Sequence, residues 1–272
     1  ALDYTVNNAV GYPMLTGAGP EPVNHVLPAW DLLSGAYAAF ALLAALRRRT
    51  ETGDGGEVRI PLSDVAIGTV ANLGSMAEVL YTGADRPRLG NTVYGLFGRD
   101  FVTADGVRTM IVVVTPRQWA NLLAALDLGA AVAAAEARLG VSFTRDDGLR
   151  FNHRDTLFPL FEQAFARRTH ADLAAALDAG GVVHSAYRAM SDAVRDPALV
   201  RDNPIFGPAE NPSGFAYPAA GAFATVPQLE RRPPASAPRN GEHSEQVLAE
   251  RLSLSSGEIA RLIDSNIVGI AQ

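Results

Sequence analysis

The sequence predicts an α/β protein that combines two kinds of unit. Residues 31–81 follow the order helix, glycine-rich turn, short strand and helix, which is typical of one unit of a parallel α/β sheet. Residues 101–179 show a hairpin pattern and then several helices, which indicates a small α+β domain. A linker rich in Gly, Pro and Arg separates the two units, and a proline-rich return segment follows them.

The first unit is predicted by its apolar, proline-free stretches. Residues 1–30 are rich in Gly, Pro and Asn, and indicate loops with one short helix. Residues 31–49 are rich in Ala and Leu and end in three arginines, whose charges complement the negative end of a helix dipole. A glycine turn then ends this helix. A short strand, EVRIP, is expected at 57–61, and a second helix over 62–81.

The small domain is predicted by its turn and helix-start signals. The triplet Ala104-Asp105-Gly106 lies between two strand-like stretches and is a hairpin signal. Pro116 suits the first position of a helix, which we expect to reach residue 128. We expect further helices at 130–139, 153–167 and 170–179, an irregular stretch at 196–226, an extended connector at 229–239, and two short helices around Ser255 within 244–264.

Composition excludes several classes of function. The 272 residues contain no cysteine, so this chain has no disulfide, thiolate metal ligand or cysteine nucleophile. All 23 positive charges are arginines, and without lysine the chain cannot form the Schiff base of pyridoxal phosphate. A net charge of -6 argues against a nucleic-acid partner. The longest apolar run has 11 residues, whereas a membrane span needs about 20. With no recognisable signal peptide, we expect a cytoplasmic protein without a membrane partner.

Asp31 is the strongest candidate for a catalytic residue. The chain lacks the motifs GxSxG, GxGxxG and HExxH, and its five histidines have no metal-ligand spacing. Asp31 opens an apolar helix, where an aspartate is most often an N-cap. The same position suits a nucleophile, because the helix dipole and free amides hold a carboxylate ionised and can stabilise a nearby oxyanion. The residues alone leave both interpretations open.

The segment around Asp31 resembles the family III CoA-transferases. In that family an aspartate opens a Gly- and Ala-rich helix that ends in an R-x-x-T-G-x-G-Q turn, and a strand and a further helix start follow. The matching positions here are Asp31, Gly35, Arg49, Thr52-Gly53 and Ser63-Asp64-Val65. The chain departs from the pattern at Glu57, where the family usually has Gln, and by an Asp-Gly inserted in the turn.

The resemblance extends along the rest of the chain. It includes Asp3-Tyr4, the hairpin at 100–106, Trp119, Asp196-Pro197 and residues 241–248. Within the family, stretches such as PVNHVLPAWD are most similar to the subgroup that isomerises mesaconyl-CoA. The chain corresponds to the last two thirds of the family pattern, so we expect the N-terminal third to lie outside it.

The resemblance implies covalent catalysis in which coenzyme A is part of the substrate and no metal or other cofactor takes part. Asp31 would attack an acyl-CoA thioester to give a mixed anhydride, and the CoA thiolate would then form an aspartyl-CoA thioester. The partners would be an acyl-CoA and a small dicarboxylic acid. Tyr4 would lie beside the thioester, Asn24 and His25 at the free carboxylate, and Leu62 near the thiol arm. Core, loop-cap and surface positions remain the alternatives for these four residues.

The resemblance also implies a domain organisation. Residues 1–81 and 205–272 would belong to an incomplete Rossmann-like large domain, and residues 100–204 would form the small α+β domain. Family members form interlocked homodimers, so we expect a homodimer in which the linker 82–99 and the connector 229–239 pass between the subunits.

Three alternatives stay open for the activity. The chain resembles in part the transferases that move CoA between separate acids of the citramalate or oxalate type. An α-methylacyl-CoA racemase shares the fold and uses a His/Asp pair to move a proton, and the resemblance places that histidine before residue 1. A non-catalytic partner subunit would keep the nucleophile segment without binding CoA on its own.

Overall fold

The computed structural model describes residues 2–271, and its contacts divide the chain into two compact units. The first unit ends at Tyr187 and the second begins at Arg188. This division groups residues by compactness and does not test the assignment to large and small domains, which stays a prediction. Each unit is described by itself below.

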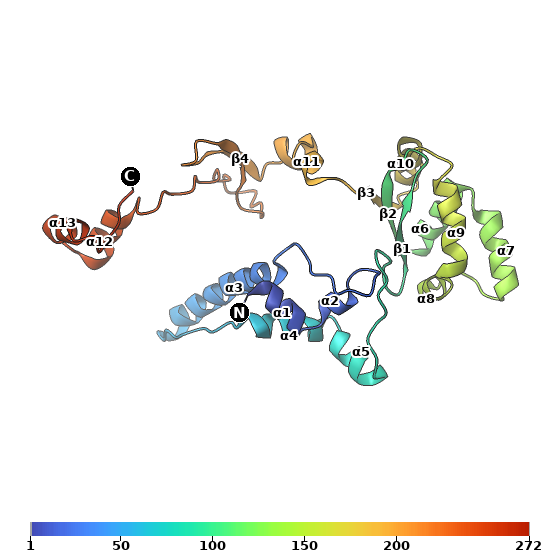
Figure 1. Cartoon of the computed structure of the whole chain (residues 1–272), viewed down its shortest axis with the longest axis horizontal. Coiled ribbons are helices and arrows are strands. Elements are labelled where there is room, and N and C mark those ends of the chain that lie inside the picture. The colour runs from blue at the N-terminus through green and yellow to red at the C-terminus, as the bar shows by residue number, and fades with distance from the viewer. Residues whose placement is uncertain (1, 272) are drawn as a thin grey trace. The chain divides into compact units, whose positions relative to one another are not determined.

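The first unit begins with five helices over residues 3–82, which we call the helical segment (Figure 1). They are α1 (Asp3–Ala9), α2 (Tyr12–Leu15), α3 (Ala29–Thr52), α4 (Leu62–Asn72) and α5 (Ser75–Thr82). Helix α1 packs against α3 and α4, and α3 also packs against α4. The single helix expected over 62–81 is therefore wrong. It is broken before α5, because Gly74 adopts a left-handed conformation with φ of 82°.

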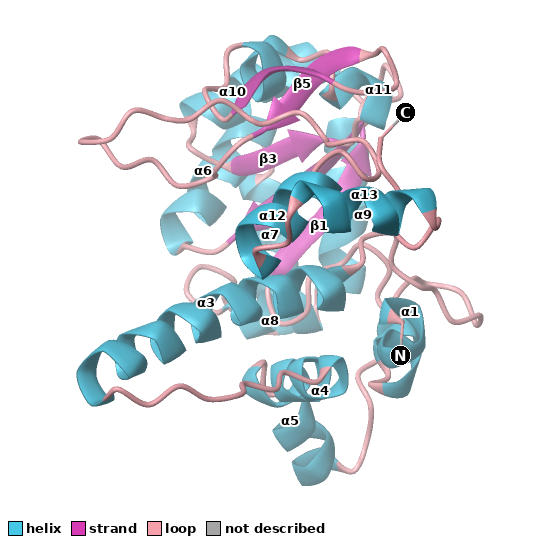
Figure 2. Ribbon diagram, turned by 90° about the vertical axis from the view of Figure 1, so that its left-hand side faces the viewer, coloured by secondary structure: helices cyan, strands magenta, loops and turns pink. Residues whose placement is uncertain are grey.

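The strand predicted at 57–61 is also wrong. These residues form extended backbone between α3 and α4, drawn as loop in Figure 2. No strand pairs with them among residues 2–271, where both sheets are antiparallel and are built from later segments. A β-strand is stable only when a neighbour satisfies its backbone N–H and C=O groups, so an apolar, β-prone pattern is not sufficient to form one.

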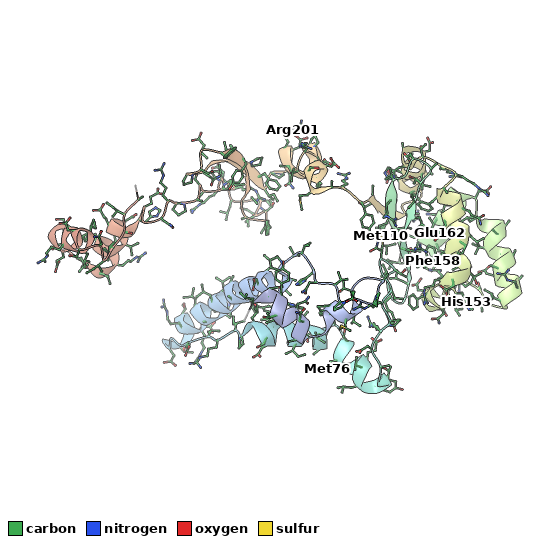
Figure 3. The ribbon with its side chains drawn as sticks, in the orientation of Figure 1. Met76, Met110, His153, Phe158, Glu162 and Arg201 are labelled. Carbon is green, nitrogen blue, oxygen red and sulfur yellow. The ribbon has the colours of Figure 1, made fainter. Side chains whose placement is uncertain are left out.

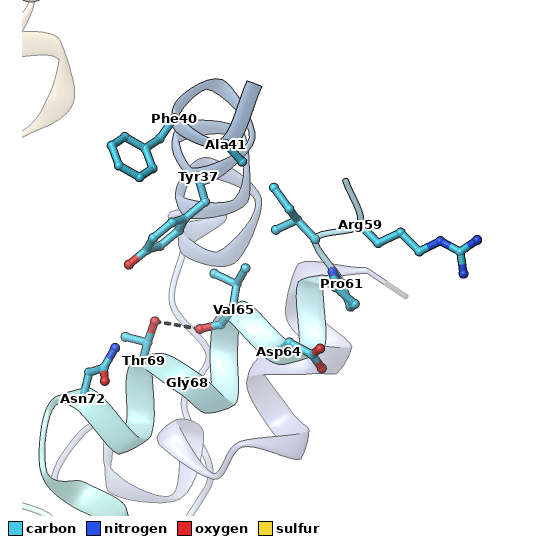
Figure 4. Close-up of a pocket in the computed structure, with 11 residues that line it drawn as sticks. Tyr37, Phe40, Ala41, Arg59, Pro61, Asp64, Val65, Gly68, Thr69 and Asn72 are labelled. Atoms are coloured by element: carbon cyan, nitrogen blue, oxygen red, sulfur yellow. Dashed lines mark hydrogen bonds between the residues drawn. The ribbon is translucent and has the colours of Figure 1, made fainter. Parts of the chain in front are cut away.

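Helix α3 leaves most of its apolar side chains exposed. Phe40 is 72% exposed and Leu43 is 67% exposed. A groove of about 420 Å³ runs between α3 and α4, and Tyr37, Phe40 and Val65 contribute to its lining (Figure 4). By length and composition alone α3 could also cross a membrane, although the core helix of a soluble domain passes the same test. Exposed apolar surface of this extent is typical of an interaction face.

The rest of the first unit is an α+β body at residues 97–186, with an antiparallel sheet in the order β1-β2-β3. Its elements are β1 (Phe97–Val102), β2 (Arg108–Val113), α6 (Pro116–Leu126), α7 (Gly129–Leu139), α8 (Asp147–Asn152), α9 (Arg154–Phe165), α10 (His170–Ala179) and β3 (Val183–Ala186). The predicted hairpin is confirmed, with Val102 opposite Arg108. Pro116 begins α6 as predicted, and Thr115 and Gln118 form a capping box there. Helix α8 and strand β3 were not predicted.

An aromatic cluster forms the core of the α+β body. Phe97 and Phe161 are fully buried, with ring centroids 4.6 Å apart, and Phe101 stacks on Phe165 at 4.9 Å. Phe158 and Glu162 project from α9 (Figure 3). Arg99 lies over the Phe158 ring at 4.8 Å and forms an ion pair with Glu162 at 3.0 Å. These contacts hold α9 on β1.

The second unit contains short elements and little core. They are α11 (Met190–Ala193), the π-helix η1 (Pro197–Arg201), β4 (Phe206–Glu210), β5 (Ala216–Ala220), α12 (Ser244–Leu252) and α13 (Ser256–Asp264). Strands β4 and β5 form a hairpin, so the irregular stretch expected at 196–226 was only partly right. The extended connector and the two helices around Ser255 are confirmed. Among the described residues of the second unit, only two apolar residues are buried, Ala209 and Ile259.

Candidate active site

Asp31 lies in the first turn of α3 and not at its N-cap. The N-cap position is held by Pro28, so Asp31 is the third helical residue. Its side chain is exposed, and no group within residues 2–271 hydrogen-bonds to its carboxylate. The N-cap interpretation is therefore wrong. What remains is an exposed carboxylate, without a hydrogen-bond partner among the described residues, in the first turn of a 24-residue helix.

The capping role at α3 belongs to Asp3 of α1. Its Oδ2 accepts hydrogen bonds from the backbone N–H of Trp30 at 2.7 Å and of Asp31 at 3.2 Å. Its Oδ1 accepts a bond from His25 Nε2 at 2.8 Å. The side chain is buried, with 3% exposure. Because Asp3 takes these two amides, the expectation of free amides beside Asp31 is wrong for Trp30 and Asp31.

The electrostatic state of Asp3 follows from these bonds. Burial by itself raises the pKa of a carboxyl group, because it removes water from the charged form. The hydrogen bonds from His25 and from the two backbone amides outweigh burial and lower the pKa of Asp3 below its usual range. The Asp3 carboxylate thus ties α1, the loop before α3 and the start of α3 together.

Asn7, one turn along α1, makes a second connection to the same place. It is 2% exposed, and its Oδ1 accepts a bond from Trp30 Nε1 at 3.2 Å. Its Nδ2 donates to Asn24 Oδ1 at 2.9 Å. Asn24 itself is exposed and uses its oxygen in this bond, so its NH2 group is left as a donor.

The four other predicted site residues all lie around the start of α3. The ring of Tyr4 meets His25 edge-on at 5.9 Å, and its hydroxyl donates to the Val26 carbonyl at 3.4 Å. Tyr4 is 45% exposed. Leu62 begins α4 and packs on a small cluster of Val6, Trp30 and Ala66. The structure thus brings Tyr4, Asn24, His25 and Leu62 together, while their roles in catalysis stay predictions.

Sequence reasoning missed Asp3 as a residue that builds the site, and it did not foresee that Asn7 bonds to Trp30 and Asn24. The only local signal was an acidic residue in the first turn of a short helix, which by itself indicates no more than a favourable dipole interaction. The bonds that matter join Asp3 to residues 22 to 28 positions away. No group of three or more His, Asp or Glu side chains placed to hold a metal occurs within the described range 2–271.

The chain resembles known proteins along almost its whole length. The model of CoA-transferase family III matches residues 1–244. The chain is 43% identical to 2-methylfumaryl-CoA isomerase of Chloroflexus aurantiacus, over 98% of this chain and 66% of that protein. It is 25% identical to succinate–glutarate CoA-transferase of Agrobacterium fabrum, over 91% of this chain and 60% of that protein. The chain therefore spans less than two thirds of the length of these relatives.

The fold has counterparts among solved structures. A CaiB/BaiF family protein from Brucella suis matches with a TM-score of 0.69 at 23% identity, over 92% of this chain and 62% of that chain. A Mycobacterium tuberculosis protein, solved as an aspartate-to-alanine variant, matches with a TM-score of 0.71 at 21% identity, over 92% and 63%. At this identity the likeness concerns the fold alone. With the family model matching nearly all of the sequence, the chain belongs to CoA-transferase family III.

Proposed function

We propose that the protein to which this chain belongs isomerises mesaconyl-CoA (2-methylfumaryl-CoA) by moving CoA from one carboxylate of the acid to the other. The observation that carries the proposal is the 43% identity to a 2-methylfumaryl-CoA isomerase across 98% of the chain. The exposed, unengaged carboxylate of Asp31 at the start of α3 supplies the group that such a transfer needs.

The first half of the reaction transfers CoA to Asp31. A carboxylate oxygen of Asp31 attacks the thioester carbon and the C–S bond breaks. The CoA thiolate departs, and a mixed anhydride between Asp31 and the acyl group is formed. The thiolate then attacks the Asp31 side-chain carbon. The anhydride C–O bond breaks, which releases mesaconate as a dianion and leaves an aspartyl-CoA thioester. Covalent catalysis divides a difficult exchange into two easier steps.

The second half repeats these steps in reverse with the other carboxylate of mesaconate. That carboxylate attacks the aspartyl thioester, the thiolate leaves, and its return to the new anhydride regenerates the Asp31 carboxylate. The steps balance without a metal, a redox cofactor or a net proton. Mesaconate must therefore stay bound, and its second carboxylate must reach the aspartyl thioester before the acid dissociates.

The groups around the start of α3 suit a dicarboxylic substrate. Asn24 offers its NH2 group to the free carboxylate, and His25 can donate to it from Nδ1 only as an imidazolium, because its Nε2–H is directed to Asp3. Asn7 and Asp3 hold these two residues in place. Tyr4 lies next to His25, half-exposed, where it can pack beside the thioester. An apolar branched acyl chain would leave such donors buried and unpaired, which costs about 1–3 kcal/mol each.

We also propose that the whole protein is a cytoplasmic, interlocked homodimer with a Rossmann-like large domain. The exposed apolar face of α3 supports this, because a free surface with Phe40 and Leu43 needs a covering layer. Light scattering coupled to size-exclusion chromatography is expected to give twice the subunit mass. A monomeric mass at micromolar concentration would contradict the dimer.

The function is tested with the full-length protein and mesaconyl-CoA as the sole substrate. We expect the two regioisomers to interconvert, as resolved by chromatography, without an added acid. Conversion that begins only after a separate acid is supplied would replace this proposal by an intermolecular transferase. Exchange of the α-proton of a methyl-branched acyl-CoA, with no CoA transfer, would instead indicate a racemase.

The nucleophile is tested by Asp31→Asn, which keeps the size of the side chain but cannot form the anhydride. We expect the rate to fall by at least about 10³-fold, as it does when other enzymes lose their nucleophile. The circular dichroism spectrum should stay unchanged, since Asp31 is exposed and makes no side-chain hydrogen bond within the described chain. Mass spectrometry checks for deamidation, and a fully amidated variant that retained the wild-type rate would refute the assignment.

A further inference from the structure

Residues 13–23, which we call the loop 13–23, comprise the end of α2 and the turn after it, and they lead directly to Asn24 and His25 of the site. The N–H of Val23 donates to the Pro13 carbonyl at 3.0 Å, which joins the two ends of the loop. Gly17 adopts a left-handed conformation with φ of 85°, and a side chain there would meet Val23 at 3.0 Å. Such closed loops are often functional. The next two residues along the chain are Asn24 and His25.

The guanidinium of Arg88 occupies the inside of this loop. Its Nε donates to the Met14 carbonyl at 2.6 Å, and its Nη2 donates to the Pro13 carbonyl at 3.1 Å. Its Nη1 donates to the carbonyls of Gly19, at 2.6 Å, and of Glu21. Two residues later, the N–H of Gly90 donates to the Gly17 carbonyl at 3.0 Å. Arg88 is thus 67 to 75 residues away in sequence from the carbonyls that it binds.

The chemistry of arginine explains why this residue occupies that place. A guanidinium carries five N–H donors in a rigid planar fork, remains charged, and forms strong bonds to several oxygens at once. With its donors directed to four main-chain carbonyls, Arg88 has its fork committed to the protein. It is therefore unsuited to take a substrate carboxylate as its main partner.

We propose that Arg88 is a positioning residue, which fixes the loop 13–23 so that Asn24 and His25 meet the free carboxylate of the acyl group. This inference rests on the proposed function, since it assigns that carboxylate to those two residues. Asn24 and His25 are held from one side by Asn7 and Asp3 and reached from the other through the loop. A loop without Arg88 loses one of these two supports, while Asp31 and its helix stay in place.

The test compares three variants of the full-length protein. Arg88→Met removes all four bonds and keeps an apolar stem, and Arg88→Lys keeps the charge but not the fork. Arg99→Met is the matched control. Arg99 is likewise engaged by the protein, but within the α+β body, where it forms an ion pair with Glu162 and lies over the ring of Phe158. Each variant is characterised by kcat and KM for mesaconyl-CoA, and by hydrogen–deuterium exchange of peptides that cover 13–25.

We expect Arg88→Met to raise KM by about 10- to 100-fold, the loss that a displaced binding group causes, with a smaller effect on kcat. Exchange within 13–25 should accelerate, Arg88→Lys should fall between Arg88→Met and the wild type, and Arg99→Met should change neither quantity. An unchanged KM, or unchanged exchange within 13–25, would overturn the inference. So would a fall in kcat alone.

The two proposals fail in different ways. If the wild type does not convert mesaconyl-CoA, the proposed function fails, whereas the exchange measurement still reports whether Arg88 holds the loop. If the wild type converts mesaconyl-CoA and Arg88→Met binds it with the same KM, only the positioning role of Arg88 fails.

Discussion

The helical segment at 3–82 and the α+β body at 97–186 differ in how they bury apolar surface. The body has a continuous core in which Phe97, Trp119 and Phe161 are 2% exposed or less. The helical segment buries a cluster of only Val6, Trp30 and Ala66, although it has the longest helix among the described residues. The residues proposed for catalysis thus belong to the region with less core of its own.

The difference has a physical consequence for stability. Burial of apolar side chains is the main favourable contribution to folding, so the body can support itself. The start of α3 depends instead on a few directed bonds through Asp3 and Asn7, which fix geometry more than they add free energy. The two tryptophans of the chain report the regions separately, because Trp30 lies in the segment and Trp119 in the body.

The largest contrast is expected for phenylalanines in the two regions. Phe161→Ala should destabilise the body by about 3–5 kcal/mol, since it empties a fully buried site. Phe40→Ala should change stability by less than about 0.5 kcal/mol in this chain, because Phe40 is 72% exposed. The effect of Phe161→Ala is measured by urea unfolding followed through the fluorescence of Trp119, in a Trp30→Phe background. The effect of Phe40→Ala is measured in the same way through Trp30, in a Trp119→Phe background.

Equal losses at the two sites would contradict the comparison. A large loss at Phe40 would mean that the face of α3 is already covered in solution, for instance by a second copy of the chain. Repeating the measurement at several protein concentrations separates these outcomes, because only an associating chain changes its midpoint.

A smaller effect is expected for the bonds at the start of α3. Asp3→Ala leaves His25 and the backbone amides of Trp30 and Asp31 without their acceptor, which should cost about 1–3 kcal/mol in the Trp30 transition. The Trp119 transition should stay where it is. An equal shift of both transitions would show that the segment and the body unfold as one unit.

The smallest effect is expected from pH. Because the folded pKa of Asp3 is lowered from 3.8, its contribution to stability is complete above that value and is lost as the pH falls through the folded pKa. The Trp30 transition of the wild type should therefore weaken below about pH 4, whereas that of Asp3→Asn should weaken less. The two proteins are compared from pH 3 to pH 7. Identical curves would exclude this role for Asp3.

Sequence alone determined the features that depend on neighbouring residues. The turn Ala104-Asp105-Gly106 set the β1–β2 hairpin, and Pro116 marked the start of α6. The family resemblance selected Asp31 and its companions Tyr4, Asn24, His25 and Leu62, which the fold then brought to one place. Turns, helix starts and motif spacing are local, so a single sequence is enough to read them.

Tertiary structure decided what depends on distant partners. Residues 57–61 have a strand pattern but no pairing strand within 2–271, and hence form no strand. Asp3 caps a helix that begins 26 residues later, and no residue near Asp3 in the sequence indicates this role. Arg88 closes a loop some 70 residues before it. Hydrogen bonds between such positions form only when the chain has folded, because no local pattern records which donor will meet which acceptor.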